Sequence, residues 1–129
     1  MVRTDIVCLD THAVVWIVGG ASKKIGAHGR TLIAAAELVI SPAVQLELQF
    51  LYEIGRVAAP ATDAIETLRR GLNLRIATDR FDDVVTFAIG EAWTRDPFDR
   101  LIVAHARMLN AVLLSRDRRV AAAYAGTRW

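Results

Sequence analysis

Residues 5–18 read DIVCLDTHAVVWIV, and in this stretch an apolar strand, an acid and a helix follow one another directly. The run Ile6-Val7-Cys8-Leu9 is apolar at every position, without the alternation of a half-exposed strand. Asp10 ends the run and opens a helix expected over residues 11–18, which a Gly-Gly pair stops. A strand that is apolar on both faces is typical of a parallel sheet covered by helices on both sides.

The alternation of apolar strands and helices continues along the whole chain. Ser41-Pro42 and Asp96-Pro97 are clear helix starts, because each supplies an N-cap residue followed by proline at the first helical position. We expect helices at 25–36, 42–54, 60–71, 81–93, 96–109 and 117–123, and strands at 37–40, 72–77, 111–115 and, at an edge, 124–129. The pattern predicts one α/β domain over residues 1–129, a three-layer α/β/α fold with a central, mostly parallel sheet.

Composition agrees with a folded domain. The chain has 129 residues, of which 53% are hydrophobic and 23% charged, so it can bury a core. It has no uninterrupted apolar run long enough for a membrane span, and the N-terminal apolar run is too short for a signal peptide. We therefore expect a cytoplasmic protein. The single cysteine, Cys8, is expected to be a buried, reduced thiol.

The net charge of +2 is small but unevenly distributed. Residues 95–129 contain seven Arg and three Asp, a local excess of four positive charges. Guanidinium groups suit phosphate, whereas a genome that prefers Arg codons explains the same excess. Charge alone does not decide between these two explanations.

Two acids follow strands directly. Asp10 comes after the first strand and Asp117 comes two residues after the strand that ends at Ser115, and each opens a helix. In α/β sheets, ligands bind beyond the carboxyl ends of the strands, where the connections switch sides. Each Asp taken alone is also explained as an N-cap.

Glu47 is harder to explain by local structure. It lies on the same helical face as an expected apolar stripe made of Val44, Leu48, Leu51 and Ile54. Burying a lone carboxylate costs several kcal/mol or forces its protonation, and a cation or an Arg would remove that cost. The position of Glu47 therefore favours a site.

Asp99 lies one turn inside the helix that Asp96 caps. Asp96 is the better N-cap because Pro97 follows it directly. Asp99 precedes Ile102 and Val103 along one side, so it is a candidate for the sheet edge, although an acid in a first turn also favours the helix dipole.

The four acids Asp10, Glu47, Asp99 and Asp117 gain weight as a set. Carboxylates brought together repel one another and shift each other's pKa unless a cation joins them. Hard divalent cations prefer oxygen ligands, so the expected cofactor is Mg²⁺ or Mn²⁺. The expected chemistry is hydrolysis of phosphodiester bonds by metal-activated water.

Several neighbours of these acids are candidate accessory residues. His12 and Ser115 are candidate hydrogen-bonding partners of a carboxylate, a metal-bound water or the substrate, although each is also explained as a structural residue. Arg100 and Arg116 are candidates for contacts with carboxylates or phosphate, although solvated surface positions explain them as well. Trp16, Trp93 and Trp129 are expected in the core or at an interface rather than as platforms for stacked bases.

At these positions the sequence resembles the PIN-domain family, and more closely its VapC-like toxins. Four segments carry the resemblance in the family's order: LDTHAVVW at 9–16, ISPAVQLE at 40–47, RDPFDRLIVAHA at 95–106 and LLSRD at 113–117. The resemblance implies a metal-dependent ribonuclease of tRNA, ribosomal RNA or messenger RNA. Its acidic quartet maps onto Asp10, Glu47, Asp99 and Asp117, with Asp96 as an accessory acid and Ser115 as the hydroxyl before the last acid.

The resemblance also implies partners. Toxin members of the family commonly form homodimers and are held inactive by a cognate VapB-like antitoxin, often through a tail residue that reaches into the acidic site. Leu46 departs from many relatives, which have an aromatic residue there, and we expect it to change the packing near Glu47 rather than ligation. Residues 55–95 show no diagnostic match.

Other classes of protein explain the sequence less well. A haloacid dehalogenase-type phosphatase needs a second Asp two residues after the first, where this chain has His12. A receiver domain needs a Lys near its end, whereas both lysines are at 23 and 24. The alternative that stays open is a non-catalytic PIN-fold module that binds RNA or protein.

Overall fold

Five parallel strands form the centre of the protein in the order β3-β2-β1-β4-β5, as seen in the computed structural model, which describes all residues from Met1 to Trp129. The strands are β1 (Arg3–Leu9), β2 (Glu37–Ile40), β3 (Arg75–Ile76), β4 (Ala111–Leu114) and β5 (Thr127–Arg128). In the register of the three central strands, Val7 of β1 lies opposite Leu38 of β2 and opposite Val112 of β4.

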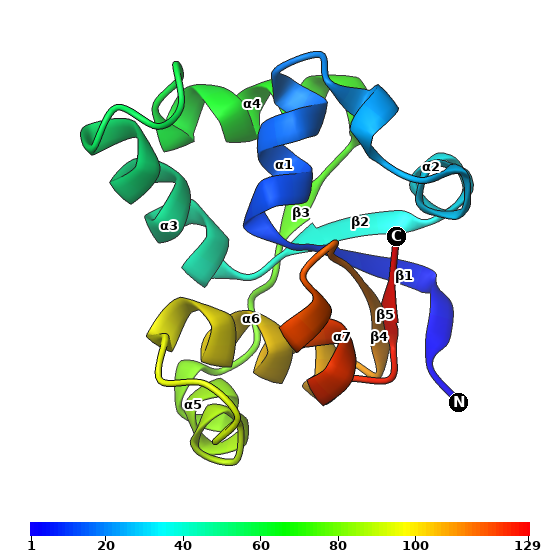
Figure 1. The fold of residues 1–129 in the computed structure, drawn as a ribbon, viewed down its shortest axis with the longest axis vertical. Coiled ribbons are helices and arrows are strands. Elements are labelled where there is room, and N and C mark those ends of the chain that lie inside the picture. The colour runs from blue at the N-terminus through cyan, green and yellow to red at the C-terminus, as the bar shows by residue number, and fades with distance from the viewer.

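Helices cover both faces of this sheet. They are α1 (Thr11–Val18), α2 (Ala27–Ala35), α3 (Pro42–Glu53), α4 (Ala61–Leu72), α5 (Phe81–Ile89), α6 (Pro97–Met108) and α7 (Arg118–Ala123), with a short 3₁₀ turn η1 (Ser22–Lys24). Figure 1 shows α1, α3 and α4 on one side of the sheet and α5, α6 and α7 on the other. The predicted three-layer α/β/α fold with a parallel sheet is confirmed.

The strand order places a switch point between β1 and β4. From β1 the chain builds outward to β2 and then β3, and it returns to the other side of β1 to form β4 and β5. Ligand sites of open α/β sheets lie beyond the carboxyl ends of the strands at such a point. At this point the Asp10 N–H donates to the Leu114 carbonyl at 3.1 Å.

The core lies in the strands and the helix faces turned toward them. Val7, Val39 and Val112 are fully buried, and β4 is buried at every position, as expected for strands covered on both faces. Cys8 is 4% exposed, and burial raises the pKa of its thiol to about 12. The predicted buried, reduced thiol is therefore confirmed.

Some predicted boundaries are wrong. The strand expected over 72–77 is only Arg75–Ile76, because α4 continues to Leu72 and Asn73 then takes a left-handed conformation with φ 55°. The helix expected to reach residue 93 ends at Ile89, where Gly90 caps it. Asn73 ends α4 by leaving the right-handed helical conformation, whereas the backbone of Gly90 remains in that region.

The apolar stripe predicted for α3 is also shorter than expected. Ile54 is the C-cap of α3 and is half-exposed, so its predicted place in the core is wrong. Elsewhere in the fold, every helix is too short or too polar to span a membrane.

Candidate active site

Asp10 is fixed by two hydrogen bonds at the end of β1. One carboxylate oxygen accepts from the N–H of Thr11 at 2.7 Å, and the other accepts from the hydroxyl of Ser115 at 2.6 Å. The side chain is buried, and desolvation raises its pKa while these two bonds act in the opposite direction. Asp10 is therefore both the N-cap of α1 and a carboxylate held rigidly at the switch point.

Glu47 reaches the same edge from α3. Its carboxylate accepts a hydrogen bond of 2.5 Å from the hydroxyl of Thr11, the residue next to Asp10. Partial burial is the main cause that raises the pKa of Glu47, and the negative charges of Asp10 and Asp96 add to it. Thr11 is buried and links β1 to α3, a role that the sequence analysis missed because the two residues are 36 positions apart.

Asp99 lies in the first turn of α6, and no N–H or O–H of the protein donates to its carboxylate. Its pKa is raised to about 7, first by desolvation and then by the negative charges of Asp96, Asp10, Glu47 and Asp117. Four other acids, from four separate segments, therefore act electrostatically on this carboxylate.

Asp117 and Ser115 lie in the loop beyond the carboxyl end of β4, at the same edge of the sheet as Asp10. The Asp117 carboxylate caps α7 by accepting from the N–H groups of Arg119 and Val120 at 2.8 and 3.4 Å. The Asp117 N–H donates to the Ser115 hydroxyl oxygen at 3.2 Å. Since the Ser115 hydroxyl also donates to Asp10, it connects the loop before α7 to the end of β1.

The accessory candidates differ in what their side chains contact. Asp96 caps α6, as its proline neighbour predicts, by accepting from the N–H of Phe98 at 2.8 Å. Arg100 turns away from the acids and donates to the Thr94 carbonyl at 2.8 Å. His12 and Arg116 are exposed, and they line a hollow of about 370 Å³ together with Asp10, Trp16, Ser115 and Asp117.

A second polar network was not predicted from the sequence. The imidazole of His105, 2% exposed, lies with Nε2 2.9 Å from a carboxylate oxygen of Asp79 and Nδ1 3.2 Å from the hydroxyl of Ser41. Ser41 is the N-cap of α3, and His105 lies on α6. The network therefore ties together the two helices that carry Glu47 and Asp99.

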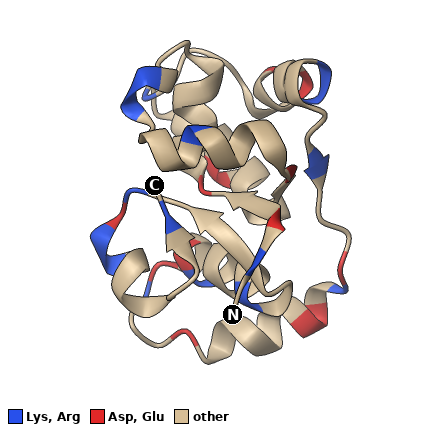
Figure 2. Ribbon diagram, turned by 90° about the vertical axis from the view of Figure 1, so that its right-hand side faces the viewer, with Lys and Arg blue, Asp and Glu red and all other residues tan.

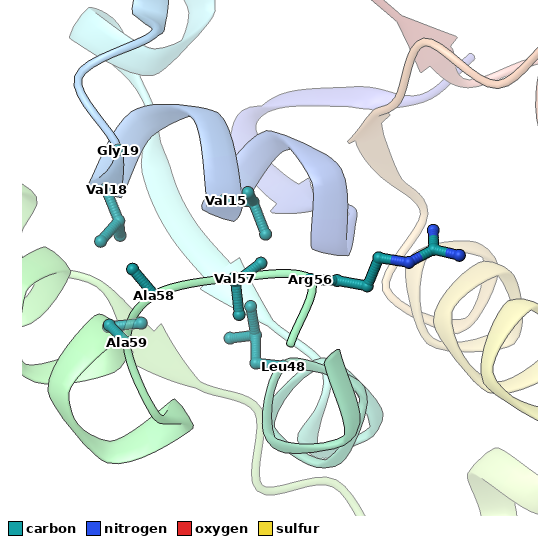
Figure 3. A pocket seen from close by; sticks show the side chains of 9 residues that line it. Val15, Val18, Gly19, Leu48, Arg56, Val57, Ala58 and Ala59 are labelled. Atoms are coloured by element: carbon teal, nitrogen blue, oxygen red, sulfur yellow. The ribbon is translucent and has the colours of Figure 1, made fainter. Parts of the chain in front are cut away.

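An apolar hollow on another part of the surface contains no such chemistry. It has a volume of about 240 Å³ and lies among α1, α3 and the segment leading to α4, lined by Val15, Val18, Leu48, Val57 and Ala64 among others. Figure 3 shows the guanidinium of Arg56 extending away from these side chains. Without a carboxylate or a nucleophile in its lining, this hollow is not a candidate for catalysis.

The residues at the acidic edge are compatible with Mg²⁺ or Mn²⁺. No three His, Cys, Asp or Glu side chains are placed so that they alone would hold one metal ion. Mg²⁺ does not need such a cage, because it keeps several waters and binds proteins through one or two carboxylates. Asp99, with a raised pKa and no donor of its own, is the carboxylate at this edge that would gain most from a cation.

The sheet order and the acidic edge define an α/β protein with a carboxylate site at its topological switch point. The chain matches the model of the PIN domain over residues 7–126, and it belongs to the PIN-domain family. None of the curated proteins matches the sequence.

Two solved structures are similar to the chain in fold. One is VapBC2 from Rickettsia felis bound to a DNA fragment from their promoter, with TM-score 0.69, 17% identity and 92% of each chain covered. Another is a toxin–antitoxin complex from Klebsiella pneumoniae, with TM-score 0.64, 15% identity, and 95% of this chain and 96% of that chain covered. At these identities the likeness concerns the fold.

Proposed function

We propose that this PIN-domain protein is a metal-dependent endoribonuclease and the toxin component of a toxin–antitoxin pair. Its site would consist of Asp10, Glu47, Asp99 and Asp117, which would bind Mg²⁺ or Mn²⁺ and hydrolyse RNA phosphodiester bonds. One observation carries the proposal: desolvation, followed by the charges of four other acids that converge on Asp99, raises the pKa of Asp99 to about 7. A folded domain tolerates such repulsion most readily where a bound cation relieves it.

The residues of the edge have separate roles in this proposal. Asp10 and Asp117 present oxygens whose positions are fixed by hydrogen bonds to Ser115 and to the first turn of α7. Thr11 orients Glu47, and Asp99 supplies a carboxylate free of protein donors. A divalent cation bound there would polarise the scissile phosphate and lower the pKa of an attacking water.

The test is RNA cleavage by the purified protein with Mg²⁺ and with EDTA. We expect Asp99→Asn and Asp10→Asn to lower the cleavage rate by more than about 100-fold, beyond the loss typical of residues that only orient ligands. Asp63→Asn, an exposed acid on α4, is the matched control and should cleave like the wild type. Equal cleavage by the wild type and both site variants would overturn the proposal, since the activity would then come from another site or a contaminant.

The same proposal includes partners and a place of action. We infer that the protein acts in the cytoplasm, forms a homodimer, and is inhibited by a small VapB-like antitoxin. The fold similarity to chains of toxin–antitoxin complexes supports the antitoxin partner. Expression of the wild type alone should slow bacterial growth, and co-expression of a neighbouring small open reading frame should restore it. Normal growth with confirmed soluble expression would contradict the toxin role.

A further inference from the structure

The hollow beside Asp10 is lined by residues of two chemical kinds. Asp10 and Asp117 are acidic, whereas Trp16, His12 and Arg116 are aromatic or basic. Its volume of about 370 Å³ lies within the range of ~300–1,000 Å³ that is usual for small-ligand sites. A ligand in this hollow would therefore contact the candidate catalytic acids and an indole ring at once.

The indole of Trp16 is surrounded by cations. The Arg116 guanidinium and the Lys24 ammonium lie over the ring, 5.8 Å and 5.6 Å from its centroid, and both residues are exposed. A base that stacks on this ring would therefore replace one of these cations over it. Figure 2 shows Lys and Arg positions in the segment leading into α7, close to the C-terminus. An RNA backbone that approaches an acidic site needs positive charge nearby, and these two residues supply it next to an aromatic ring.

The ring of Trp16 is also held in place from behind. Trp129 packs edge-on against it, with ring centroids 5.2 Å apart. Trp129 in turn lies against two glycines at the start of α2, where a Cβ on Gly26 would lie 2.8 Å from the Trp129 carbonyl oxygen and one on Gly29 would lie 3.1 Å from its carbonyl carbon. A larger residue at Gly26 would displace the backbone of Trp129, the residue whose ring packs against Trp16.

We propose that the hollow beside Trp16 binds one unpaired base of single-stranded RNA, stacked on the indole, with its phosphate contacted by Arg116 and Lys24. This inference rests on the proposed ribonuclease function and specifies its substrate as an unstacked nucleotide beside the scissile bond. Stacking on an aromatic side chain accepts any base, because every base has a π-face. It gives Trp16 a binding role, where the sequence alone favoured a core or interface position.

The experiment measures RNA binding in an Asp99→Asn background, with Mg²⁺ present, so that turnover does not interfere. The probe is fluorescently labelled octauridylate, compared with versions that have a single abasic nucleotide at each successive position. We expect one abasic position to weaken binding about 10-fold, within the range for loss of one stacked base. The same position should have no effect once Trp16 is replaced by Leu, because the two changes remove the same contact.

Matched variants separate stacking from charge and from misfolding. Trp16→Phe should keep most of the affinity, because phenylalanine still offers a ring. Arg116→Ala should lower the salt dependence of binding by about one phosphate contact, whereas Arg69→Ala on α4 should leave it unchanged. These two Arg variants test the site even if Trp16→Leu does not fold.

The outcomes distinguish the two proposals. If abasic positions weaken binding equally in the Trp16 and Trp16→Leu proteins, the base site is overturned, whether or not the wild type cleaves RNA. If Arg116→Ala and Arg69→Ala have equal salt dependence, the phosphate contact is overturned. If the wild type cleaves no RNA but the abasic effect depends on Trp16, the nuclease proposal fails and the base site stands.

Discussion

Asp10 and Asp99 lie at the same acidic edge, but the protein treats their carboxylates differently. Both oxygens of Asp10 accept hydrogen bonds, from the Thr11 N–H and the Ser115 hydroxyl. The carboxylate of Asp99 receives no donor and faces the negative charge of four other acids. The fold thus satisfies one acid with its own groups and leaves the other dependent on a ligand.

This difference has a physical consequence. A carboxylate already satisfied by protein donors gains little when a cation arrives, but it is held where a metal needs it. An unsatisfied carboxylate among like charges gains a great deal, so it couples metal binding to stability. In our proposal Asp10 provides geometry and Asp99 provides most of the response to the metal.

The largest effect on this contrast is expected when the Thr11 hydroxyl, which orients the Glu47 carboxylate, is removed. Thr11→Val keeps the shape of the side chain but removes the hydroxyl that binds the Glu47 carboxylate. We expect RNA cleavage to fall by about 10- to 100-fold, as is typical when a group that orients a metal ligand is lost. Thr67→Val, in which an exposed hydroxyl bonded only to its own helix is removed, should cleave like the wild type. Equal rates for the two variants would show that Glu47 needs no orientation.

Local signals in the sequence predicted much of this edge. Asp10, Ser41, Asp96 and Asp117 all cap helices through their side chains, because N-capping depends only on residues one to three positions away. The bounds of α1 and β2 also agree with the prediction, since Asp10 and Gly19 flank α1 and the N-cap Ser41 with Pro42 follows β2. The fold class followed from the same short-range pattern.

The contacts between segments were not predictable in this way. The Thr11–Glu47 bond spans 36 positions and the His105–Asp79 contact spans 26, and neither has a periodic signal in the sequence. The predictions that Arg100 and Arg116 contact carboxylates or phosphate rested on adjacency to Asp99 and Asp117. In the structure Arg100 donates to a backbone carbonyl and Arg116 lies over Trp16, and neither forms an ion pair with a carboxylate, so only the contact with phosphate stays a prediction. Side-chain direction and tertiary packing decide such contacts.

A smaller difference between Asp10 and Asp99 is expected in how their substitution changes the free energy of unfolding without metal. Asp99→Asn removes a repelled charge and breaks no hydrogen bond, so we expect the free energy of unfolding in EDTA to rise by about 1 kcal/mol. Asp10→Asn also removes a buried charge, but it disturbs an acceptor of two hydrogen bonds and should gain less. Urea unfolding of both variants beside Asp63→Asn measures the difference. A larger gain for Asp10→Asn would reverse the roles assigned to the two acids.

A further effect is the pH dependence of that metal-free stability. The pKa of Asp99 is about 7 in the folded protein, whereas its ordinary value, which applies to the unfolded chain, is 3.8. At a pH between these two values the folded state therefore retains a proton that the unfolded state has lost. Stability therefore decreases as pH rises from about 4 to 7, and the raised pKa values of Asp10 and Glu47 act in the same direction. Urea unfolding in EDTA across this range should show a shallower decrease for Asp99→Asn than for the wild type. Parallel curves would mean that Asp99 is already satisfied without a cation, which would remove the distinction from Asp10.

Added Mg²⁺ should stabilise the wild type more at pH 7 than at pH 5, because the cation competes with the proton for the same carboxylate.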